Sequence, residues 1–160
     1  MRTIKLFCIP YAGCSASIYS KWKRKLPQDI ELIPLEPAGR GRRCDEPLYN
    51  NLNEAVDDLY WEAAKVLDRS DEYILFGHSM GSLLAFELYY KLMEEGFREP
   101  LHLYVSGARL PIWNGASSTM TSRWNSFKNT LWTMMYNRLR YSRMMNSFIF
   151  FFRSLDPISK

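Results

Sequence analysis

Residues 73–96 read YILFGHSMGSLLAFELYYKLMEEG, and this stretch decides the fold of the chain. The apolar run Tyr73–Phe76 is typical of a buried strand. Residues Met80–Glu95 are rich in Leu, Ala, Phe and Tyr, and Gly96 follows them, which predicts a helix with a glycine cap. A strand, a tight turn and a helix in this order predict one unit of an α/β sheet.

The same alternation extends in both directions from this stretch. Ile4–Ile9, Ile30–Leu35 and Leu101–Val105 read as further strands, and Ser17–Leu26 and Leu52–Leu67 read as helices. Strands that are separated by helices form right-handed crossovers and pair in parallel. We therefore predict, for residues 1–112, an α/β core with a mostly parallel sheet and helices on both faces.

The composition excludes several classes of protein. The chain has 160 residues, of which 47% are hydrophobic and 24% charged, so it is neither disordered nor collagen-like. Three cysteines without a paired spacing argue against a disulfide scaffold. The start of the chain lacks a signal-peptide pattern, and no apolar run approaches the roughly 20 residues of a membrane span. We expect a cytoplasmic protein that does not act at a membrane.

The charge of the chain is unevenly distributed. The net charge is +4, yet residues 1–112 hold 14 basic and 16 acidic side chains. Residues 113–160 hold 7 basic side chains and a single acid, Asp156, together with five of the eight methionines. This change in composition predicts two parts, a core over 1–112 and a basic, Met/Trp-rich tail over 113–160.

The turn between the strand and the helix carries a motif for nucleophilic catalysis. Gly77-His78-Ser79-Met80-Gly81 is a G-x-S-x-G nucleophile elbow, in which glycines leave room for a tight turn. Ser79 is then exposed at the carboxyl edge of the sheet. The backbone N–H of Met80, at the helix N-terminus, is placed to stabilise an oxyanion. A second N–H donor is expected from the loop Tyr11–Gly13, which follows a neighbouring strand.

Four segments together resemble one known family. LFCIPYAGCSAS (6–17), LEPAGRGRR (35–43) with EPL (46–48), LFGHSMGSLLAFELYYKL (75–92) and LYVSGARLP (103–111) are similar to the type II, or external, thioesterases. These α/β-hydrolases accompany nonribosomal peptide and polyketide synthases. The resemblance covers Lys5 to about Pro111, so it implies the amino-terminal half of an α/β-hydrolase without its last strands.

The resemblance also implies a reaction and a partner. Family members hydrolyse unwanted acyl groups from the phosphopantetheine arm of acyl or peptidyl carrier domains. It assigns Ser79 as nucleophile and the amides of Ala12 and Met80 as the oxyanion hole, and it implies neither a cofactor nor a metal. Cys14 departs from the family, which usually has glycine there. We expect no nucleic-acid partner, since no recognised module for that purpose is present.

The triad aspartate and histidine of the family have no counterpart in this chain. His78 belongs to the elbow itself, and His102 alternates with leucines on a strand, as a packing residue does. The acids before the elbow read as solvated residues of a helix and a loop; they are Asp57, Asp58, Asp68 and Asp71. The alternative to a working thioesterase is therefore an inactive fragment, or an interaction protein, of the same lineage.

The tail from Trp113 to Lys160 has two interpretations. If new codons are formed from the third base of each codon and the first two bases of the next, Met144-Met145-Asn146 gives an Asp and then a Glu. The codons that follow in this shifted frame permit a segment that resembles the lid of the family. A frameshift near residues 111–120 would explain the lost acids and the excess of Met and Trp. The alternative is a basic amphipathic helix over residues 124–152 that binds a membrane or a partner. We expect the tail to be helical or disordered, and the last strand of the core to keep an open edge that promotes aggregation.

The arginines of the Gly/Arg loop also have two interpretations. Arg40, Arg42 and Arg43 could meet the phosphate of phosphopantetheine. The ordinary interpretation, which we favour, is a solvated loop in which an arginine pairs with Glu46.

Overall fold

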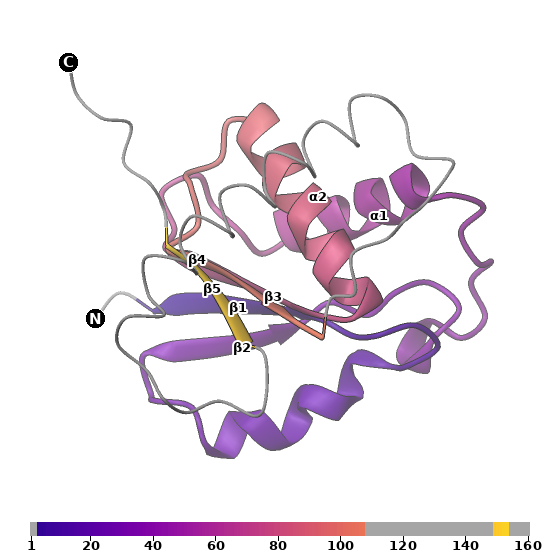
Figure 1. Ribbon diagram of the computed structural model, residues 1–160, viewed down its shortest axis with the longest axis horizontal. Helices are drawn as coiled ribbons and strands as arrows, with labels where there is room; N and C mark the ends of the chain where they lie inside the picture. The colour runs from indigo at the N-terminus through magenta and orange to yellow at the C-terminus, as the bar shows by residue number, and fades with distance from the viewer. Residues whose placement is uncertain (1–2, 108–148, 154–160) are drawn as a thin grey trace.

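The computed structural model describes residues 3–107 and 149–153, which form a five-stranded sheet with helices on both faces (Figure 1). Strands β1 to β4 pair in parallel, and the order across the sheet is β2-β1-β3-β4-β5. The strands span β1 (Ile4–Ile9), β2 (Ile30–Pro34), β3 (Tyr73–His78), β4 (His102–Ser106) and β5 (Ile149–Arg153). The predicted mostly parallel α/β sheet is confirmed.

Three helices lie where the sequence predicts them, with shifted ends, and a fourth, η2, is a short 3₁₀-helix in the segment predicted as the Gly/Arg loop. They are η1 (Ala16–Arg24), η2 (Gly41–Arg43), α1 (Leu52–Ala64) and α2 (Met80–Glu94). Asn51 caps α1 by accepting a 3.0 Å hydrogen bond from the Glu54 amide. The segment predicted as the first helix is a 3₁₀-helix, and its cap Ser15 accepts from the Ser17 amide at 3.1 Å.

Alternation along the strands builds one hydrophobic core on each face of the sheet. Phe7, Tyr73, Leu75, Leu103 and Val105 pack against α1 and α2 in the larger core. Their neighbours along the strands point to the opposite face and meet Tyr19 and Trp22 of η1; they are Leu6, Cys8, Ile74, Phe76 and Tyr104. In Figure 1, α1 and α2 accordingly lie above the sheet and η1 lies below it.

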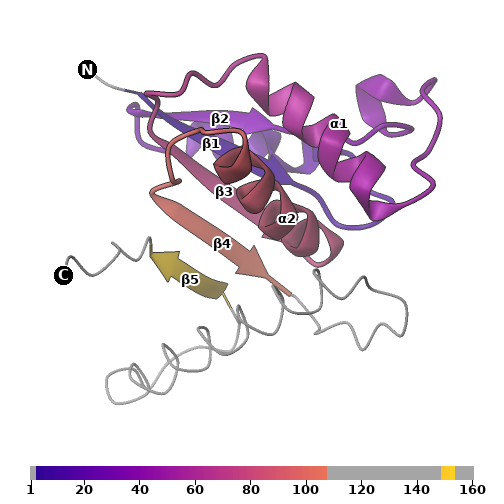
Figure 2. The ribbon, with the colours of Figure 1, turned by 90° about the horizontal axis from the view of Figure 1, so that it is seen from above.

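The edge of β4 is covered, which corrects two expectations about the tail. β5 pairs antiparallel with β4, with Ile149 opposite Ser106 and Arg153 opposite His102 (Figure 2). Residues 149–153 are therefore a strand and are neither helical nor disordered. The β-favouring sequence IFFFR supplies the backbone partners that an open edge would lack. The rest of the tail, including the shifted-frame segment from Met144 to Asn146, lies outside the described residues.

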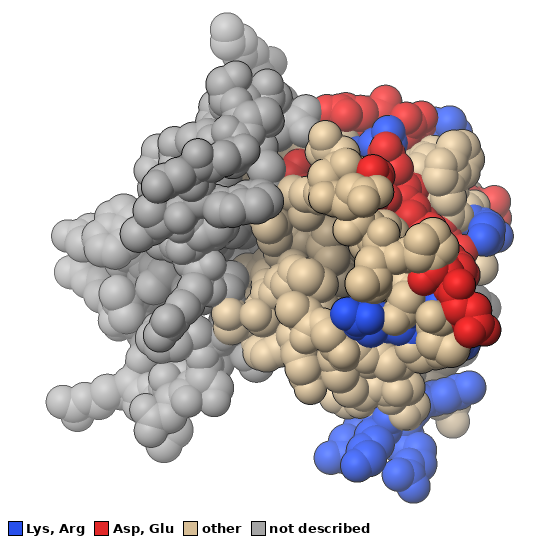
Figure 3. Space-filling model, turned by 90° about the vertical axis from the view of Figure 1, so that its right-hand side faces the viewer, with Lys and Arg blue, Asp and Glu red and all other residues tan. Residues whose placement is uncertain are grey.

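Charge separates across the sheet. Lys21, Lys23, Arg24 and Lys25 of η1 and its cap are exposed, and none of them has an ionic partner among the described residues. In Figure 3 basic side chains gather at the lower edge, where η1 lies, and acidic ones form a band toward the top, where α1 and α2 lie. None of the helices within residues 3–107 is both long enough and apolar enough to cross a membrane.

Candidate active site at the turn after β3

Ser79 occupies a strained turn between β3 and α2. Its backbone angles are φ 53° and ψ −115°, and it is the only residue other than glycine with positive φ in the described part of the chain. Such a conformation costs on the order of 1–3 kcal/mol and persists only where the surroundings impose it. The side chain is exposed, so its hydroxyl is open to a substrate.

The two glycines of the motif are required by close backbone contacts. A Cβ at position 77 would lie 2.0 Å from the carbonyl oxygen of Gly81. A Cβ at position 81 would lie 2.3 Å from the Ile9 carbonyl oxygen and 2.6 Å from that of Pro10. Because backbone atoms cannot move aside as side chains do, only glycine fits at both positions. The second contact also places the end of β1, and hence the loop after it, against the elbow.

Hydrogen bonds with Ser82 and Ser106 stabilise the elbow. The Ser79 amide donates to the Ser106 carbonyl oxygen at 2.7 Å. The fully buried hydroxyl of Ser82 lies 2.9 Å from the Gly77 carbonyl oxygen and 3.0 Å from that of Ser106, and it accepts from the Ser106 amide at 3.3 Å. These hydrogen bonds connect β3, β4 and α2 next to the strained residue Ser79.

The two expected oxyanion donors come from neighbouring segments. Met80 is the first residue of α2, where backbone N–H groups have no partner within the helix. Tyr11, Ala12 and Gly13 are exposed in the loop after β1. The Cys14 amide donates a 3.1 Å hydrogen bond to the Tyr11 carbonyl oxygen, which makes this loop a tight turn. A hydrogen bond with Cys14 also raises the pKa of the Tyr11 phenol.

Neither histidine is placed as a base for Ser79. The Nδ1 atom of His78 lies 3.1 Å from the Ser106 hydroxyl oxygen. The His78 ring packs edge-on against the Tyr11 ring, with 5.7 Å between the ring centroids. His102 begins β4, at the end of the sheet opposite the elbow, about 13 Å along the strand from Ser106. Its Nδ1 atom is buried and has no hydrogen-bond partner in the described residues. Within those residues, the Ser79 hydroxyl has no hydrogen-bond partner either.

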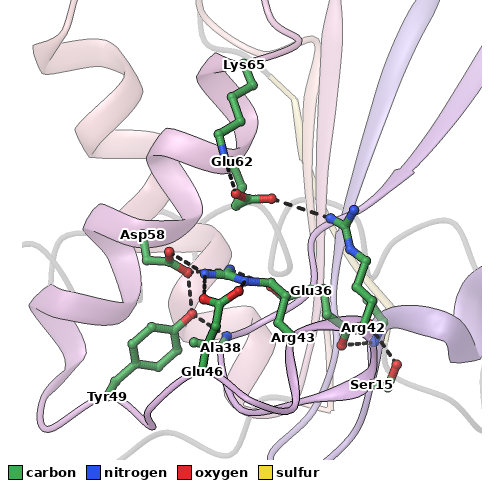
Figure 4. A network of polar contacts seen from close by, with 11 residues as sticks. Ser15, Glu36, Ala38, Arg42, Arg43, Glu46, Tyr49, Asp58, Glu62 and Lys65 are labelled. Atoms are coloured by element: carbon green, nitrogen blue, oxygen red, sulfur yellow. Dashed lines mark hydrogen bonds and ion pairs between the residues drawn. The ribbon is translucent and has the colours of Figure 1, made fainter.

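Asp58, one of the acids before the elbow, is more than a solvated residue. Arg43 binds both carboxylate oxygens of Asp58, at 2.7 and 2.8 Å, and also contacts Glu46 (Figure 4). The Tyr49 hydroxyl donates to Asp58 at 2.5 Å. Burial raises the pKa of Asp58, but the bonds from Arg43 and Tyr49 outweigh it and hold that pKa below its usual range.

The other arginines of the Gly/Arg loop have partners of their own. Arg40 donates to the Gly39 carbonyl oxygen, and the exposed Arg42 reaches Glu62 at 3.4 Å. The predicted pairing of an arginine with Glu46 is therefore found at Arg43. Nothing in these contacts directs the three guanidinium groups toward Ser79.

The cysteines are all free thiols. Cys8 is fully buried, and burial raises its pKa to about 12, so it is a packing residue rather than a nucleophile. Among residues 3–107 and 149–153, no group of three His, Cys, Asp or Glu residues is arranged to hold a metal ion.

Sequence reasoning missed the residues that support the site from outside the motif. Ser82 directly follows the elbow, but its sequence position does not reveal that it bonds to two strands. Ser106 and Glu36 lie within the motifs that carry the family resemblance, yet their contacts are made over long separations in the chain. For Ser106 the available signal was a polar residue that directly follows the apolar residues of a strand.

Comparisons with known proteins agree with this geometry. The family described as "Thioesterase domain" matches residues 4–144, a range that extends past Pro111. The gramicidin S biosynthesis protein GrsT of Aneurinibacillus migulanus is 35% identical over 108 residues, which are 68% of this chain and 41% of that protein. The human medium-chain S-acyl fatty acid synthase thioesterase is 36% identical over 106 residues, covering 66% of this chain and 40% of that protein. The chain thus spans about two fifths of the length of these curated relatives.

Solved structures show the same architecture. ClbQ from the colibactin NRPS/PKS pathway superposes with a TM-score of 0.67 at 42% identity, over 72% of this chain and 48% of that one. RedJ, a thioesterase of prodiginine biosynthesis in Streptomyces coelicolor, gives a TM-score of 0.65 at 29% identity, over 86% of this chain and 53% of that one. With its elbow, its sheet order and these matches, the chain belongs to the thioesterase domain family and has an α/β-hydrolase fold.

Proposed function

We propose that this chain carries the nucleophile and the oxyanion hole of a type II thioesterase, which removes acyl or peptidyl groups from the phosphopantetheine of carrier domains. The exposed, strained Ser79 carries the proposal. Strain of this kind is retained at sites where it has a use. The similarity to GrsT, a gramicidin S biosynthesis protein, and to ClbQ, from the colibactin NRPS/PKS pathway, supports this substrate class.

The proposed reaction has two steps. The Ser79 Oγ atom attacks the thioester carbonyl carbon, and the oxygen that becomes negative accepts hydrogen bonds from the amides of Met80 and Ala12. The carbon–sulfur bond breaks, the pantetheine sulfur takes up a proton, and an acyl-serine ester remains. Water then adds to that ester and releases the carboxylic acid and free Ser79. Neither a cofactor nor a metal takes part in this proposal.

The proposed chemistry needs a general base. His78 bonds to Ser106 and His102 lies at the far end of β4, so neither accepts the Ser79 proton. Loss of the triad histidine in a serine hydrolase lowers turnover about 10⁶-fold. We therefore expect the 160-residue chain on its own to hydrolyse thioesters very slowly. The proposed setting is the cytoplasm, since free cysteines are typical of a reducing compartment.

Hydrolysis of an acyl-pantetheine thioester tests the proposal. Three proteins are compared: the 160-residue chain, its Ser79→Ala variant, and a version continued in the shifted reading frame beyond residue 111. We expect strong hydrolysis only in the third protein, and we expect that activity to disappear when Ser79→Ala is added. If the shifted frame encodes no family-like Asp and His, the frameshift hypothesis is wrong. If the restored protein hydrolyses no thioester, the chain is an inactive or interacting member of the lineage.

A further inference from the structure

Glu36 is a buried carboxylate whose partners all lie at the end of the loop that contains Ala12. Its side chain belongs to a residue that is only 5% exposed. One carboxylate oxygen accepts from the Ala16 amide at 2.9 Å, and the other accepts from the Ser15 hydroxyl at 2.8 Å (Figure 4). No cation within the described residues bonds to this carboxylate, so two neutral donors compensate its burial.

Gly41 closes the opposite side of this contact. A Cβ at position 41 would lie 2.4 Å from a Glu36 carboxylate oxygen and 2.5 Å from the Ser15 hydroxyl oxygen. The segment from Glu36 to Gly41 therefore wraps closely around the end of the loop, and Gly41 adopts φ 47° to do so. We call the contact among Glu36, Ser15 and Ala16 the Glu36 clasp.

The loop that the clasp holds is supported internally by the contact of Tyr11 with His78 and by the bond from the Cys14 amide to the Tyr11 carbonyl oxygen. Tyr11, Ala12 and Gly13 are exposed, and a Cβ at Gly13 would meet no atom within 4 Å. At its start, the loop is fixed by β1 and by a bond from the Tyr19 hydroxyl to the Ile9 carbonyl oxygen at 3.0 Å. At its end, the side-chain contact to another strand or loop is the Glu36 clasp. Ala12 therefore lies between these two anchors, directly after Tyr11.

We propose that Glu36 is a positioning residue that aims the Ala12 amide at the oxyanion site, a role that rests on the proposed function of Ala12 as an oxyanion donor. Glu36 does not touch the substrate. It fixes Ser15 and Ala16, and the short, glycine-containing loop transmits that constraint to Ala12. Oxyanion donors must be held in place before the reaction, because reorganisation during it would cost much of their benefit.

Amide dynamics test the clasp without any need for catalysis. ¹⁵N relaxation is measured on the full 160-residue chain and on its Glu36→Ala, Glu36→Gln and Ser15→Ala variants. We expect the order parameters of the Ala12 and Gly13 amides to fall from about 0.85 to below about 0.6 in Glu36→Ala and in Ser15→Ala. Glu36→Gln keeps an acceptor for the Ala16 amide and should retain most of the order. Glu62→Gln is the matched control, because Glu36 and Glu62 both line a cleft of about 740 Å³, and within the described residues the Glu62 carboxylate pairs with Arg42 and Lys65 rather than with the loop.

Trapping of Ser79 supplies a readout that a purely structural role would not change. The Ser79 Oγ atom attacks the phosphorus of a fluorophosphonate, the P–F bond breaks and fluoride leaves, the hydroxyl proton passes to water, and a tetrahedral phosphorus adduct remains on the serine oxygen. We expect Glu36→Ala to slow this reaction about 100-fold, which is the cost of one lost oxyanion donor. The midpoint of unfolding of the protein should change little. Glu36→Gln should recover most of the rate, and Glu62→Gln should match the parent chain.

The outcomes separate this proposal from the proposed function. Rigid Ala12 and Gly13 amides in both Glu36→Ala and Ser15→Ala would overturn the role of Glu36, whatever the chemistry of Ser79. If Glu36→Ala does not fold, Ser15→Ala and Glu36→Gln decide by the same amides. If the version continued in the shifted frame hydrolyses no thioester, the proposed function of Ser79 fails, and the relaxation data still decide whether Glu36 orders the loop.

Discussion

The Ser79 amide nitrogen lies 2.7 Å from the Ser106 carbonyl oxygen, so the turn that exposes the nucleophile is hydrogen-bonded to the end of the neighbouring strand. The same carbonyl oxygen also lies 3.0 Å from the Ser82 hydroxyl. The strained residue is thus held by β4 and α2 as well as by β3. The geometry of the site depends on how these three elements meet.

Replacement of Ser82 by alanine tests this dependence. The fully buried Ser82 hydroxyl contacts the Gly77 and Ser106 carbonyl oxygens, and its loss leaves both with fewer partners. We expect Ser82→Ala to lower the free energy of unfolding by about 1–3 kcal/mol. Urea denaturation measures the change. The control is Ser20→Ala, at an exposed serine that bonds only to the Ser17 carbonyl oxygen, where a change within about 0.5 kcal/mol is expected.

A methyl group at Gly81 should be tolerated far less than one at Gly13. The new Cβ at position 81 would meet the backbone oxygens of Ile9 and Pro10, which cannot yield without moving β1. We expect Gly81→Ala to destabilise the protein by about 3 kcal/mol or more. Gly13 has φ 77° but open space around it, so Gly13→Ala should cost only about 1–2 kcal/mol. Equal losses at the two positions would show that the close approach of β1 and the elbow is not what requires Gly81.

The Asp58–Arg43 pair should make stability depend on pH in the acidic range. The pKa of Asp58 is lowered in the folded state, so its contribution is present above the unfolded value of about 3.9 and is lost as the pH falls through the folded value. We expect Asp58→Asn to be less stable than the parent near neutral pH and to lose less stability on acidification. Thermal melts between pH 7 and pH 3 test this. Glu31→Gln, at an exposed carboxylate, should retain the acid sensitivity of the parent.

His102 should have no part in any hydrolysis by this chain. It lies at the end of β4 opposite Ser106, and the residue is only partly exposed. We expect His102→Ala to leave the small Ser79-dependent rate of thioester hydrolysis unchanged. A rate that falls to the level of Ser79→Ala, in a variant that remains folded by circular dichroism, would make His102 the base that the geometry excludes.

Removal of β5 should make the protein aggregate. β5 pairs with β4 along the edge that would otherwise be open. A chain that ends at residue 148 exposes the backbone groups of β4, so we expect more light scattering and earlier precipitation on concentration than for the full chain. Equal solubility of the two chains would mean that β5 does not protect this edge in solution.

Much of the fold could be predicted because its signals are local. The alternation of apolar runs and helical patterns gave four parallel strands, and G-x-S-x-G between a strand and a helix located Ser79 at the turn. The helix ends were less accurate, since Ala64 rather than Leu67 ends α1, where packing and capping compete.

The remaining features depend on contacts between distant parts of the chain. β5 pairs with a strand more than forty residues earlier, and the composition of the tail gave no register for that pairing. Glu36 and Ser106 gain their importance from the backbone atoms they meet, which no pattern in the sequence identifies. Asp58 looked like a surface acid of a helix because its partner Arg43 lies in η2, fifteen residues before it.

The four cations of η1 and its cap, which have no ionic partner among the described residues, and the acids of α1 and α2 give this part of the molecule an electric dipole across the sheet. α1 carries four acidic residues and no basic one, while η1 and its cap carry only cations. In an external field, or near a charged macromolecule, this dipole exerts a torque that turns the η1 side toward negative charge before any contact is made. The orienting effect reaches about 10 Å at 0.1 M salt and shortens as the ionic strength rises.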